Sequence, residues 1–265
     1  MVSGVAASAV CVLLIISPDM RTAAAQMWRT ITMSRVDVVR VDFDDLPDEA
    51  ASLSPQALVK LNPPMVAQGL AEAQARVGFV PRLPQGVLGS PVRLSTMGKL
   101  SIGTVLRGSD VHLALSRAGI NDEIVPNEWD GAHLALHFGE SVIAEWPEIS
   151  LMQSLPPALV TPPDFDFGSF ARVMLRAAGM ARVPAERYGR RMAVAPALLI
   201  GVGAGDDVAL REVELKPGRA TAIESFDDDG HSVRMEVIWA VADRVYLLSG
   251  MMSQDRAVAI ANTVR

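Results

Sequence analysis

The sequence predicts an α+β protein in which an antiparallel-rich sheet packs against a few helices, preceded by an N-terminal apolar membrane-anchor or signal segment. Three observations support this prediction. Short runs of alternating apolar and polar residues fill most of the second half of the chain, as in strands with one buried face. Stretches of helical periodicity interrupt these runs without a regular strand–helix alternation, which disfavours a parallel sheet. An uncharged apolar run opens the chain.

That opening run covers residues 2–16 and contains no charged side chain. It is shorter than the roughly 20 apolar residues of a full span but has the length of a signal-peptide apolar region. Ala23–Ala25 would offer a small-residue cleavage site, yet no basic residue precedes the run and Arg21 precedes the site. We therefore favour a single-pass anchor at the cell membrane, with residues 1–25 as the transmembrane or signal segment and the bulk of the chain extracytoplasmic.

Residues 26–55 are expected to hold a short helical remnant, a strand at 34–43 and a linker at 44–55, and residues 56–265 the extracytoplasmic α+β domain. Asn62 and Pro63 have the residue types that start helices. The predicted helix ends at Gly78. Its buried face comprises Val66, Leu70, Ala73 and Val77.

Further along the chain we expect strands at residues 101–107, 111–116, 132–138 and 141–153. A helix follows at 167–178, with Arg172 and Arg176 turned away from the core, and a brief helix starts at Pro184. The remaining predicted strands are residues 196–202, 208–216, 219–226, 232–242 and 244–250. A last helix, capped by Ser253, is expected to bury Ala257, Ile260, Ala261 and Val264.

The charge balance and the cysteine count exclude several classes of site. There are 24 basic and 30 acidic residues, for a formal net charge of −6, so we expect no nucleic-acid partner. The single cysteine, Cys11, excludes an intramolecular disulfide and a cysteine-based zinc site within this chain. Cys11 follows Val10 rather than Gly or Ala, which disfavours lipidation.

The run PALLIGVGAGDD at residues 196–207 has the glycine spacing of a phosphate-binding loop. A dinucleotide site needs a helix directly after the glycines, because the helix N-terminus holds the pyrophosphate. Here Gly201, Gly203 and Gly205 lead to Asp206 and Asp207, and the following residues have a strand pattern. We interpret the run as a strand followed by a structural turn and expect no nucleotide cofactor.

Two further groups of residues resemble metal sites. His133 and His137, with Asp130 and Glu140 nearby, would share one face of a helix, but the intervening residues favour a strand, which disperses the four groups. Residues 225–236 partly match a calcium loop, with Asp227, Asp229, Gly230 and Glu236 at ligand or glycine places. A tight hairpin turn explains the same residues, so we predict no metal ligand in either group.

Trp239 is the aromatic residue for which a ligand platform would be the alternative to a core position. It lies in register with Val233, Met235, Val237 and Val241 on one face of an alternating strand, while Arg234 and Glu236 are expected to face out to solvent. This pattern is typical of a sheet face that packs on helices. We expect Trp239 to be in the core.

Three segments resemble one known family. Residues 75–86 have an aromatic–Pro–Leu-Pro–Gly order, residues 155–180 a proline-rich lead and a helix, and residues 238–262 a closing hairpin and helix. Together they resemble the extracytoplasmic domain of membrane-anchored bacterial proteins with a cytoplasmic anti-sigma-factor zinc-binding domain. The likeness covers roughly residues 70–265, and the zinc-binding domain is absent from this sequence. That outer domain has no assigned activity, so the resemblance implies no functional residues.

The expectation for function is a non-enzymatic, membrane-tethered extracytoplasmic module with a sensing or regulatory role. Its partners would be the membrane, through the N-terminal segment, and an envelope protein or small ligand. The alternatives are a secreted protein that binds a small molecule, lipid or peptide, and a hydrolase with a site assembled from scattered residues. No Gly-x-Ser-x-Gly motif is present, and we name no catalytic, cofactor-binding or metal-binding residue.

Overall fold

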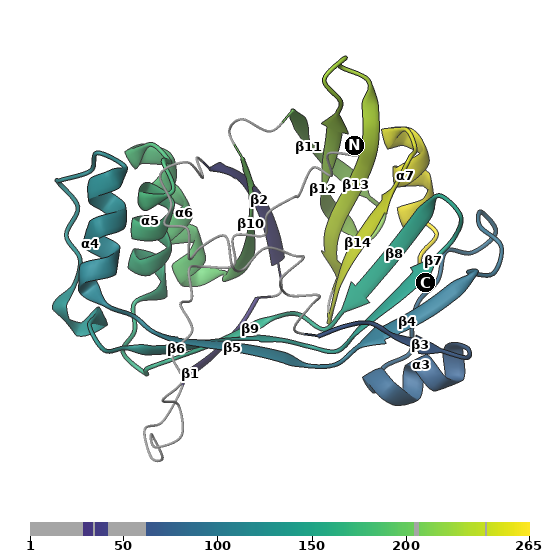
Figure 1. Cartoon of the computed structure of the whole chain (residues 1–265), viewed down its shortest axis with the longest axis horizontal. Coiled ribbons are helices and arrows are strands. Elements are labelled where there is room, and N and C mark those ends of the chain that lie inside the picture. The colour runs from purple at the N-terminus through teal and green to yellow at the C-terminus, as the bar shows by residue number, and fades with distance from the viewer. Residues whose placement is uncertain (1–28, 34, 42–61, 204–206, 242) are drawn as a thin grey trace.

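The computed structural model describes residues 29–33, 35–41, 62–203, 207–241 and 243–265. Two lobes are joined by long strands that run along the base of the molecule (Figure 1). One lobe, here called the helix lobe, is a four-stranded sheet covered by helices. The other, the sheet lobe, is an eight-stranded sheet with helices on its outer face. The predicted α+β class with antiparallel-rich sheets is confirmed.

The eight-stranded sheet is antiparallel throughout and has the order β11-β12-β13-β14-β8-β7-β4-β3. Its strands are β3 (Met65–Ala67), β4 (Arg93–Met97), β7 (Ser141–Glu145), β8 (Ile149–Ser154), β11 (Val208–Leu215), β12 (Gly218–Phe226), β13 (Ser232–Val241) and β14 (Arg244–Gly250). The predicted strands from residue 208 onward are confirmed. The single strand predicted at 141–153 is wrong, because residues 146–148 turn the chain between β7 and β8.

The four-stranded sheet has the order β1-β9-β6-β5, with β1 (Arg29–Thr32), β5 (Leu100–Val105), β6 (His133–Phe138) and β9 (Ala158–Thr161). Strand β1 replaces the helical remnant expected there. Three chain segments serve both sheets, since β4 leads into β5, β6 into β7 and β8 into β9. A Cβ at Gly139 would lie 2.5 Å from the Leu155 Cβ, so these segments pass too closely for any larger residue.

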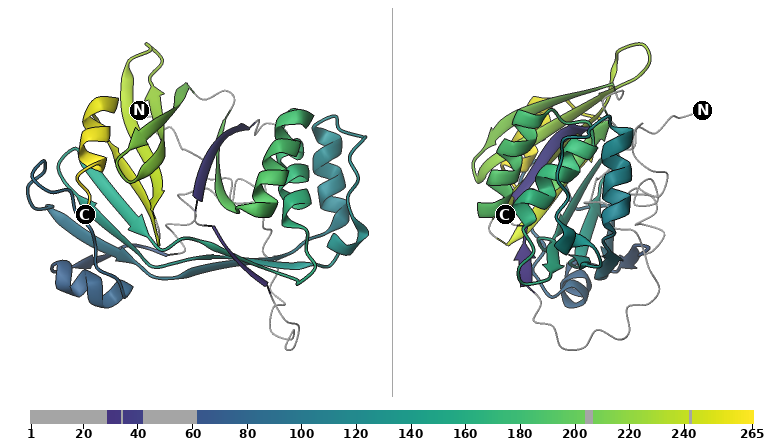
Figure 2. Two further views of the ribbon diagram at one scale, coloured as in Figure 1. Left: turned by 180° about the vertical axis from the view of Figure 1, so that it is seen from behind. Right: turned by 90° about the vertical axis from the view of Figure 1, so that its left-hand side faces the viewer.

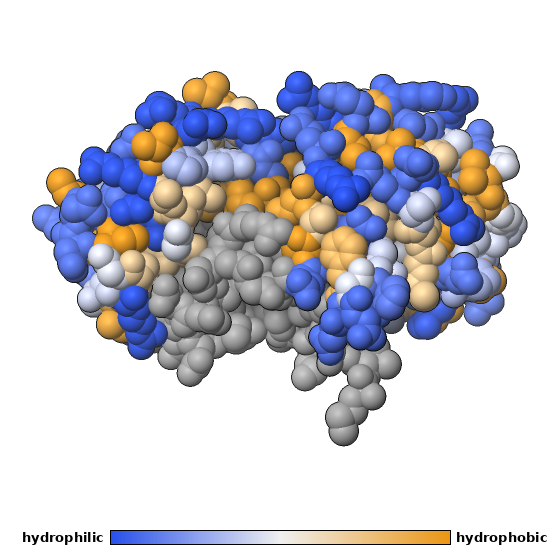
Figure 3. All heavy atoms as spheres, turned by 90° about the horizontal axis from the view of Figure 1, so that it is seen from above, coloured by the Kyte–Doolittle hydropathy of each residue, from blue (hydrophilic) through white to orange (hydrophobic). Residues whose placement is uncertain are grey.

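A two-stranded parallel sheet of β2 (Arg35–Val41) and β10 (Ala197–Gly203) lies between the lobes. Val39 and Leu199 belong to the core of the helix lobe, while Val38 and Ile200 pack against the cluster of Ile223 and Ile238 in the eight-stranded sheet. Both strands were predicted, but their parallel pairing was not. Seen from above, apolar residues gather in the middle of the molecule and hydrophilic residues dominate the rim (Figure 3).

Three helices stand side by side in the helix lobe, α4 (Gly108–Arg117), α5 (Phe167–Ala177) and α6 (Arg182–Val194) (Figure 2). Helix α5 is confirmed, and α6 is longer than the brief helix expected. The strand predicted at 111–116 is wrong. Val111, Leu113 and Leu115 alternate like a strand, but the residues that α4 buries are Val111, Ala114 and Leu115, at helical spacing. Leu113 is exposed.

Helices α3 (Leu70–Val77) and α7 (Gln254–Ala261) cover the outer face of the eight-stranded sheet. Ser253 caps α7 as predicted, accepting a hydrogen bond from the Arg256 N–H, and Ala257, Ile260 and Ala261 are buried. The start predicted for α3 is wrong, because the Asn62 side chain donates to the Gly98 carbonyl and the next residues form β3. Gly78 ends α3 with φ 70°, as predicted.

Several predictions lie outside the described residues, namely the segment 1–25, the linker at 44–55 and residues Gly205 and Asp206. Among the helices that the structure does describe, none is long and apolar enough to cross a bilayer.

Candidate functional site

The described residues on either side of the glycine run belong to strands. Strand β10 ends at Gly203, and the next described element is strand β11, which begins at Val208 and pairs with β12. The strand predicted after the glycines is therefore confirmed. A phosphate site of the dinucleotide type needs the N–H groups of a helix at that position, and the chain places a strand there instead.

Among the four metal-competent groups around β6, His137, Asp130 and Glu140 each contact a different side chain or backbone group. His133 and His137 lie on the face of β6 opposite the buried Leu134 and Leu136, as a strand requires. His137 Nδ1 lies 2.6 Å from the Ser101 hydroxyl. The Asp130 carboxylate accepts the Gly108 N–H at 2.9 Å, at the start of α4, and Glu140 pairs with Lys99 at 3.3 Å. The predicted dispersal of this group is confirmed.

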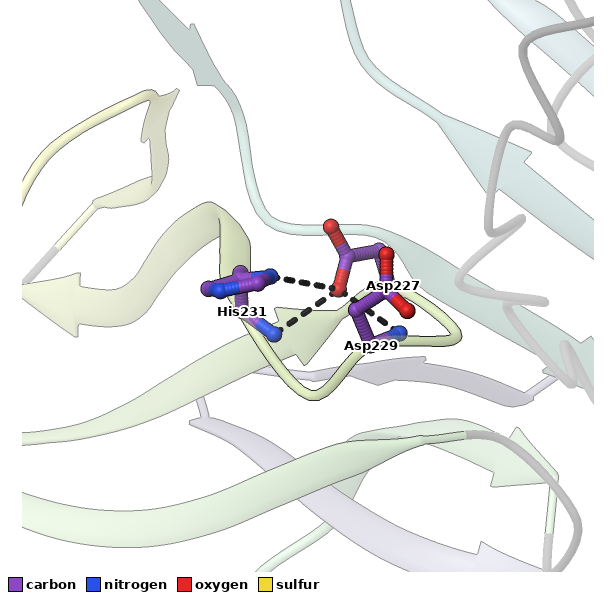
Figure 4. A group of neighbouring side chains, drawn as sticks. All are labelled: Asp227, Asp229 and His231. Carbon is purple, nitrogen blue, oxygen red and sulfur yellow. Dashed lines mark hydrogen bonds and ion pairs between the residues drawn. The ribbon is translucent and has the colours of Figure 1, made fainter.

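The hairpin between β12 and β13 brings Asp227, Asp229 and His231 together at an exposed tip (Figure 4). One ligand atom from each residue lies within 4.8 Å of the others. The Asp227 carboxylate accepts the N–H groups of His231 at 2.8 Å and Asp229 at 3.1 Å. The His231 N–H is the main cause of the lowered pKa of Asp227, and the nearby imidazole adds to it. Asp227 therefore closes a turn, as predicted, with Gly230 at φ 78°.

Glu236, the twelfth residue of the calcium-like pattern, lies within β13 and does not join this turn. It pairs with Arg234 at 3.0 Å and accepts the Ser249 hydroxyl at 3.3 Å. The expectation that Glu236 faces solvent is wrong, because β2 packs against this face of β13 and leaves Glu236 only 8% exposed. Arg172 and Arg176 likewise do not turn fully outward, since both contact Glu123.

Trp239 is a core residue, as predicted. It is 3% exposed and stacks on Tyr246 with 4.9 Å between ring centroids and 8° between ring planes. Met235 and Val237 are buried beside it, and Val233 is the exception on this face at 37% exposure. Because the Trp239 ring is buried and stacked on Tyr246, it has no exposed face on which a ligand could bind.

A groove with a volume of about 540 Å³ lies on the sheet lobe. One wall is β3 with the start of α3, and the other is the segment 83–94. The rim carries three exposed apolar side chains, Val66 (54%), Leu70 (44%) and Val92 (71%). We define the groove rim as these three residues together with Arg93. Val66 and Leu70 were predicted to be buried, and both instead face this groove.

The segment 83–94 is fixed by hydrogen bonds to the sheet. Trp146 Nε1 donates to the Gly89 carbonyl at 2.7 Å, and the Val92 N–H donates to the Glu145 carbonyl at 2.8 Å. The fully buried Gln153 side chain bonds both the N–H and the carbonyl of Arg82, at 2.8 and 2.9 Å. These hydrogen bonds hold this wall of the groove in place, which lowers the entropic cost of filling the groove.

The edge of β3 is closed to a further strand. Arg76 donates to the Val66 carbonyl at 2.9 Å, and the Gln68 N–H donates to Glu72 at 2.6 Å. This N–H is the main cause of the lowered pKa of Glu72, with Arg76 adding to it. Because Arg76 and Glu72 already bond these edge groups, the groove offers side-chain contacts rather than a free strand edge.

A second pocket of about 340 Å³ lies where β7 and β8 meet β13 and β14. Its lining is more polar and includes Glu145, Glu148, Ser150, Arg234 and Ser249. Sequence patterns missed both hollows, because each joins residues distant along the chain. One signal for the groove was present in the sequence. Val87 and Val92 are apolar residues in a segment rich in proline and glycine, where no helix or strand is expected to bury them.

The chain matches no family model, no curated protein and no solved structure. The resemblance to the outer domain of anti-sigma-factor-like proteins therefore stays a prediction. Its first segment has a structural role here, since Phe79 is buried and the Arg244 guanidinium lies 4.2 Å from its ring centroid.

Proposed function

We propose that this chain is a non-enzymatic, membrane-tethered extracytoplasmic module with a sensing or regulatory role, and that it binds a short apolar peptide segment of an envelope protein in the groove between α3 and residues 83–94. The observation that carries the proposal is the groove rim, where exposed valine and leucine side chains border a hollow of about 540 Å³. Ligand sites commonly fall between about 300 and 1,000 Å³ and are mostly apolar.

The chemistry of the groove favours a peptide with an acidic group beside its apolar side chains. Arg93 is the charged residue among those that line the groove, and its side chain is 53% exposed. Its ion pair with Glu145 is 3.4 Å long and lies at the surface, where such pairs contribute little. Arg93 can therefore turn to a ligand carboxylate at small cost, while Val66, Leu70 and Val92 contact aliphatic side chains on either side of it.

The test of the groove is selection from a phage-displayed random dodecapeptide library on the purified full chain. We expect enrichment of apolar peptides that contain Asp or Glu. Val92→Asp should weaken binding about tenfold or more, because it places a charge where the apolar side chains of the peptide would pack. Arg93→Glu should shift the selected peptides from acidic to basic. Val80→Asp is the matched control, because Val80 is 62% exposed and outside the groove.

Equal loss of binding in Val80→Asp and Val92→Asp would contradict the groove as the site. Displacement of bound peptides by phospholipid monomers, with no preference for peptide sequence, would favour the lipid-binding alternative.

The tether is supported by the uncharged run at residues 2–16 and is tested separately. After cell fractionation the full chain should stay with membranes in alkaline carbonate, and protease added to spheroplasts should degrade the domain. Release of a soluble fragment that begins after Ala25 would instead favour the secreted alternative. Protection from external protease in intact spheroplasts would contradict the extracytoplasmic assignment.

A further inference from the structure

Helix α6 concentrates positive charge in an acidic protein. Its 13 residues include Arg182, Arg187, Arg190 and Arg191 but only one acid, Glu186, whereas the whole chain has a formal charge of −6. Glu186 contacts Arg182 at 3.0 Å and Arg190 at 4.0 Å. No ion pair involves Arg187 among the described residues, and Arg187 is exposed. The helix therefore carries more positive charge than its own acid neutralises.

The outward face of α6 combines these arginines with exposed apolar side chains. Val183, Arg187, Arg190 and Val194 follow one another at spacings of four, three and four, so they form one stripe along the helix. Val183 is 65% exposed and Val194 is 87% exposed. The opposite face is buried through Ala185, Gly189 and Met192, which fixes the stripe in its outward direction. We call these four residues the α6 stripe.

The charged neighbours of the stripe leave it basic. Asp122, from the loop after α4, lies 3.3 Å from Arg182, and Asp37 of β2 lies 3.9 Å from Arg191. Asp37 is also held by Arg35 at 2.9 Å. These acids sit beside the two arginines outside the stripe, and Arg187 and Arg190 remain directed to solvent.

The start of the described chain lies next to this helix. Arg29 and Ile31 of β1 line a cavity of about 220 Å³ together with Met192 and Ala193, in the last turns of α6. About 12 residues separate Arg29 from the apolar run that ends at residue 16, and such a length spans at most roughly 40 Å. A tether through that run would therefore keep Arg29, and with it the last turns of α6, within roughly 40 Å of the bilayer.

From these observations we infer that the α6 stripe is a docking surface for an anionic lipid leaflet, which orients the tethered domain with its helix lobe against the membrane. This inference rests on the proposed tether. Each basic side chain near an anionic surface changes partitioning about fivefold, and exposed valines can enter the headgroup region. Such attraction is too weak to anchor a protein alone, but it is sufficient to orient one that a second segment already anchors.

The experiment uses the full chain with Cys11→Ser and an environment-sensitive nitrobenzoxadiazole label at Val194→Cys, reconstituted into vesicles. The vesicles contain phosphatidylcholine alone or with phosphatidylglycerol, plus spin-labelled lipid as quencher. We expect a blue shift and quenching in anionic vesicles only. Both should be lost in 1 M salt, where the screening length falls to about 3 Å. A label at Val80→Cys, in the sheet lobe, should respond to neither lipid.

Two charge reversals test the arginines themselves. Arg187→Glu combined with Arg190→Glu should reduce the quenching at least fivefold. The matched control is Arg211→Glu combined with Arg219→Glu, two exposed arginines of the sheet lobe, which should leave the quenching unchanged.

The outcomes separate this inference from the tether. If the chain floats with neither kind of vesicle in a density gradient, both the tether and the orientation are overturned. If the chain floats with both kinds of vesicle but the label at residue 194 is never quenched, the tether is supported and the orientation is overturned. A label that ignores lipid but shifts with polyglutamate would assign the α6 stripe to an acidic protein instead, and would equally overturn it.

Discussion

Each lobe is built around one buried tryptophan, and the two tryptophans are held in different ways. Trp239 stacks on Tyr246, its direct cross-strand partner in the β13–β14 register. Trp129 comes from a 3-10 turn, η1 (Asn127–Trp129), and packs edge-on against Phe170 at 5.6 Å and tilted against Phe165 at 5.9 Å. One core is set by strand register, and the other is assembled from a loop, a turn and a helix.

The difference shows which contacts depend on neighbouring elements. In the sheet lobe, the register of the β13–β14 ladder alone places Trp239 beside Tyr246. In the helix lobe, Trp129 reaches its partners only when η1 and α5 are both in place. The α5–α6 contact is equally demanding, because Gly168 and Gly189 bring the two helix backbones together without side chains between them. The helix lobe should therefore tolerate added volume poorly.

The largest expected effect is that of Trp239→Ala, which should lower the free energy of unfolding by about 3–5 kcal/mol. The loss combines the burial of the ring, its stack on Tyr246 and the cavity left behind. Urea denaturation measures it, with Trp239→Phe as a milder control. A melting temperature unchanged by Trp239→Ala would place this residue outside the core and remove the basis of the comparison.

Gly168→Ala should cost about 1–3 kcal/mol, as overpacking does. The added Cβ would lie 2.8 Å from the Ala193 Cβ and 2.9 Å from the Gly189 carbonyl oxygen, so α5 and α6 must move apart. Gly108→Ala is the control in the same lobe, because its Cβ meets only the Asp130 side chain at 3.7 Å. If both variants unfold at the same urea concentration as the wild type, the close helix contact does not limit this lobe.

Asp166→Ala should destabilise the helix lobe by about 1 kcal/mol at pH 7, because the Asp166 carboxylate caps α5. The Ser169 hydroxyl and then the Ser169 N–H lower the pKa of Asp166 in the folded state. Its contribution is therefore complete above the unfolded value of about 3.9 and is lost as the pH falls through the lower folded pKa.

The stability difference between wild type and Asp166→Ala should accordingly hold from pH 7 to about pH 4 and shrink below it. Asp166→Asn keeps the cap without titrating in this range and serves as the control. A difference that is the same at pH 7 and at pH 2.5 would show that the ionised carboxylate is not what stabilises α5.

The smallest effect is expected at the exposed β12–β13 turn of the sheet lobe. Asp229→Ala should change stability by no more than about 0.5 kcal/mol, and millimolar calcium or zinc should leave the melting temperature unchanged. A cation at a hundred times its dissociation constant would add about 2.7 kcal/mol, which a thermal scan resolves easily. A metal-dependent rise in the melting temperature that Asp229→Ala abolishes would show that this hairpin tip binds a metal.

The sheet lobe was the more predictable half, for a physical reason. From Val208 to Gly250 the alternation of apolar and polar residues matches the strands closely. The reason is that one face of each strand contributes to the apolar core that the eight-stranded sheet forms with α7. The alternation of Val111, Leu113 and Leu115 led to the wrong prediction of a strand. Only tertiary packing decides which apolar residues of α4 are buried. The parallel β2–β10 pairing has no local signal, because it joins segments about 160 residues apart in the chain.

The candidate groove was beyond reach of the sequence for a related reason. Val66 and Leu70 have the spacing of a helix face, so periodicity assigned both to the core together with Ala73 and Val77. The chain is extended at Val66, and α3 starts only at Leu70, so the four residues do not share one face. Which of them contacts the segment 83–94 depends on the pairing of β3 with β4.

The pairing of β2 with β10 also governs the order in which the molecule can be completed during synthesis. Arg35 and Ala197 are neighbours in the sheet but about 160 residues apart in the chain. At roughly 5–20 residues per second, β2 waits on the order of ten to thirty seconds for its partner to leave the ribosome. During that interval β2 lacks the one strand that pairs with it among the described residues, and an unpaired strand edge is open to aggregation.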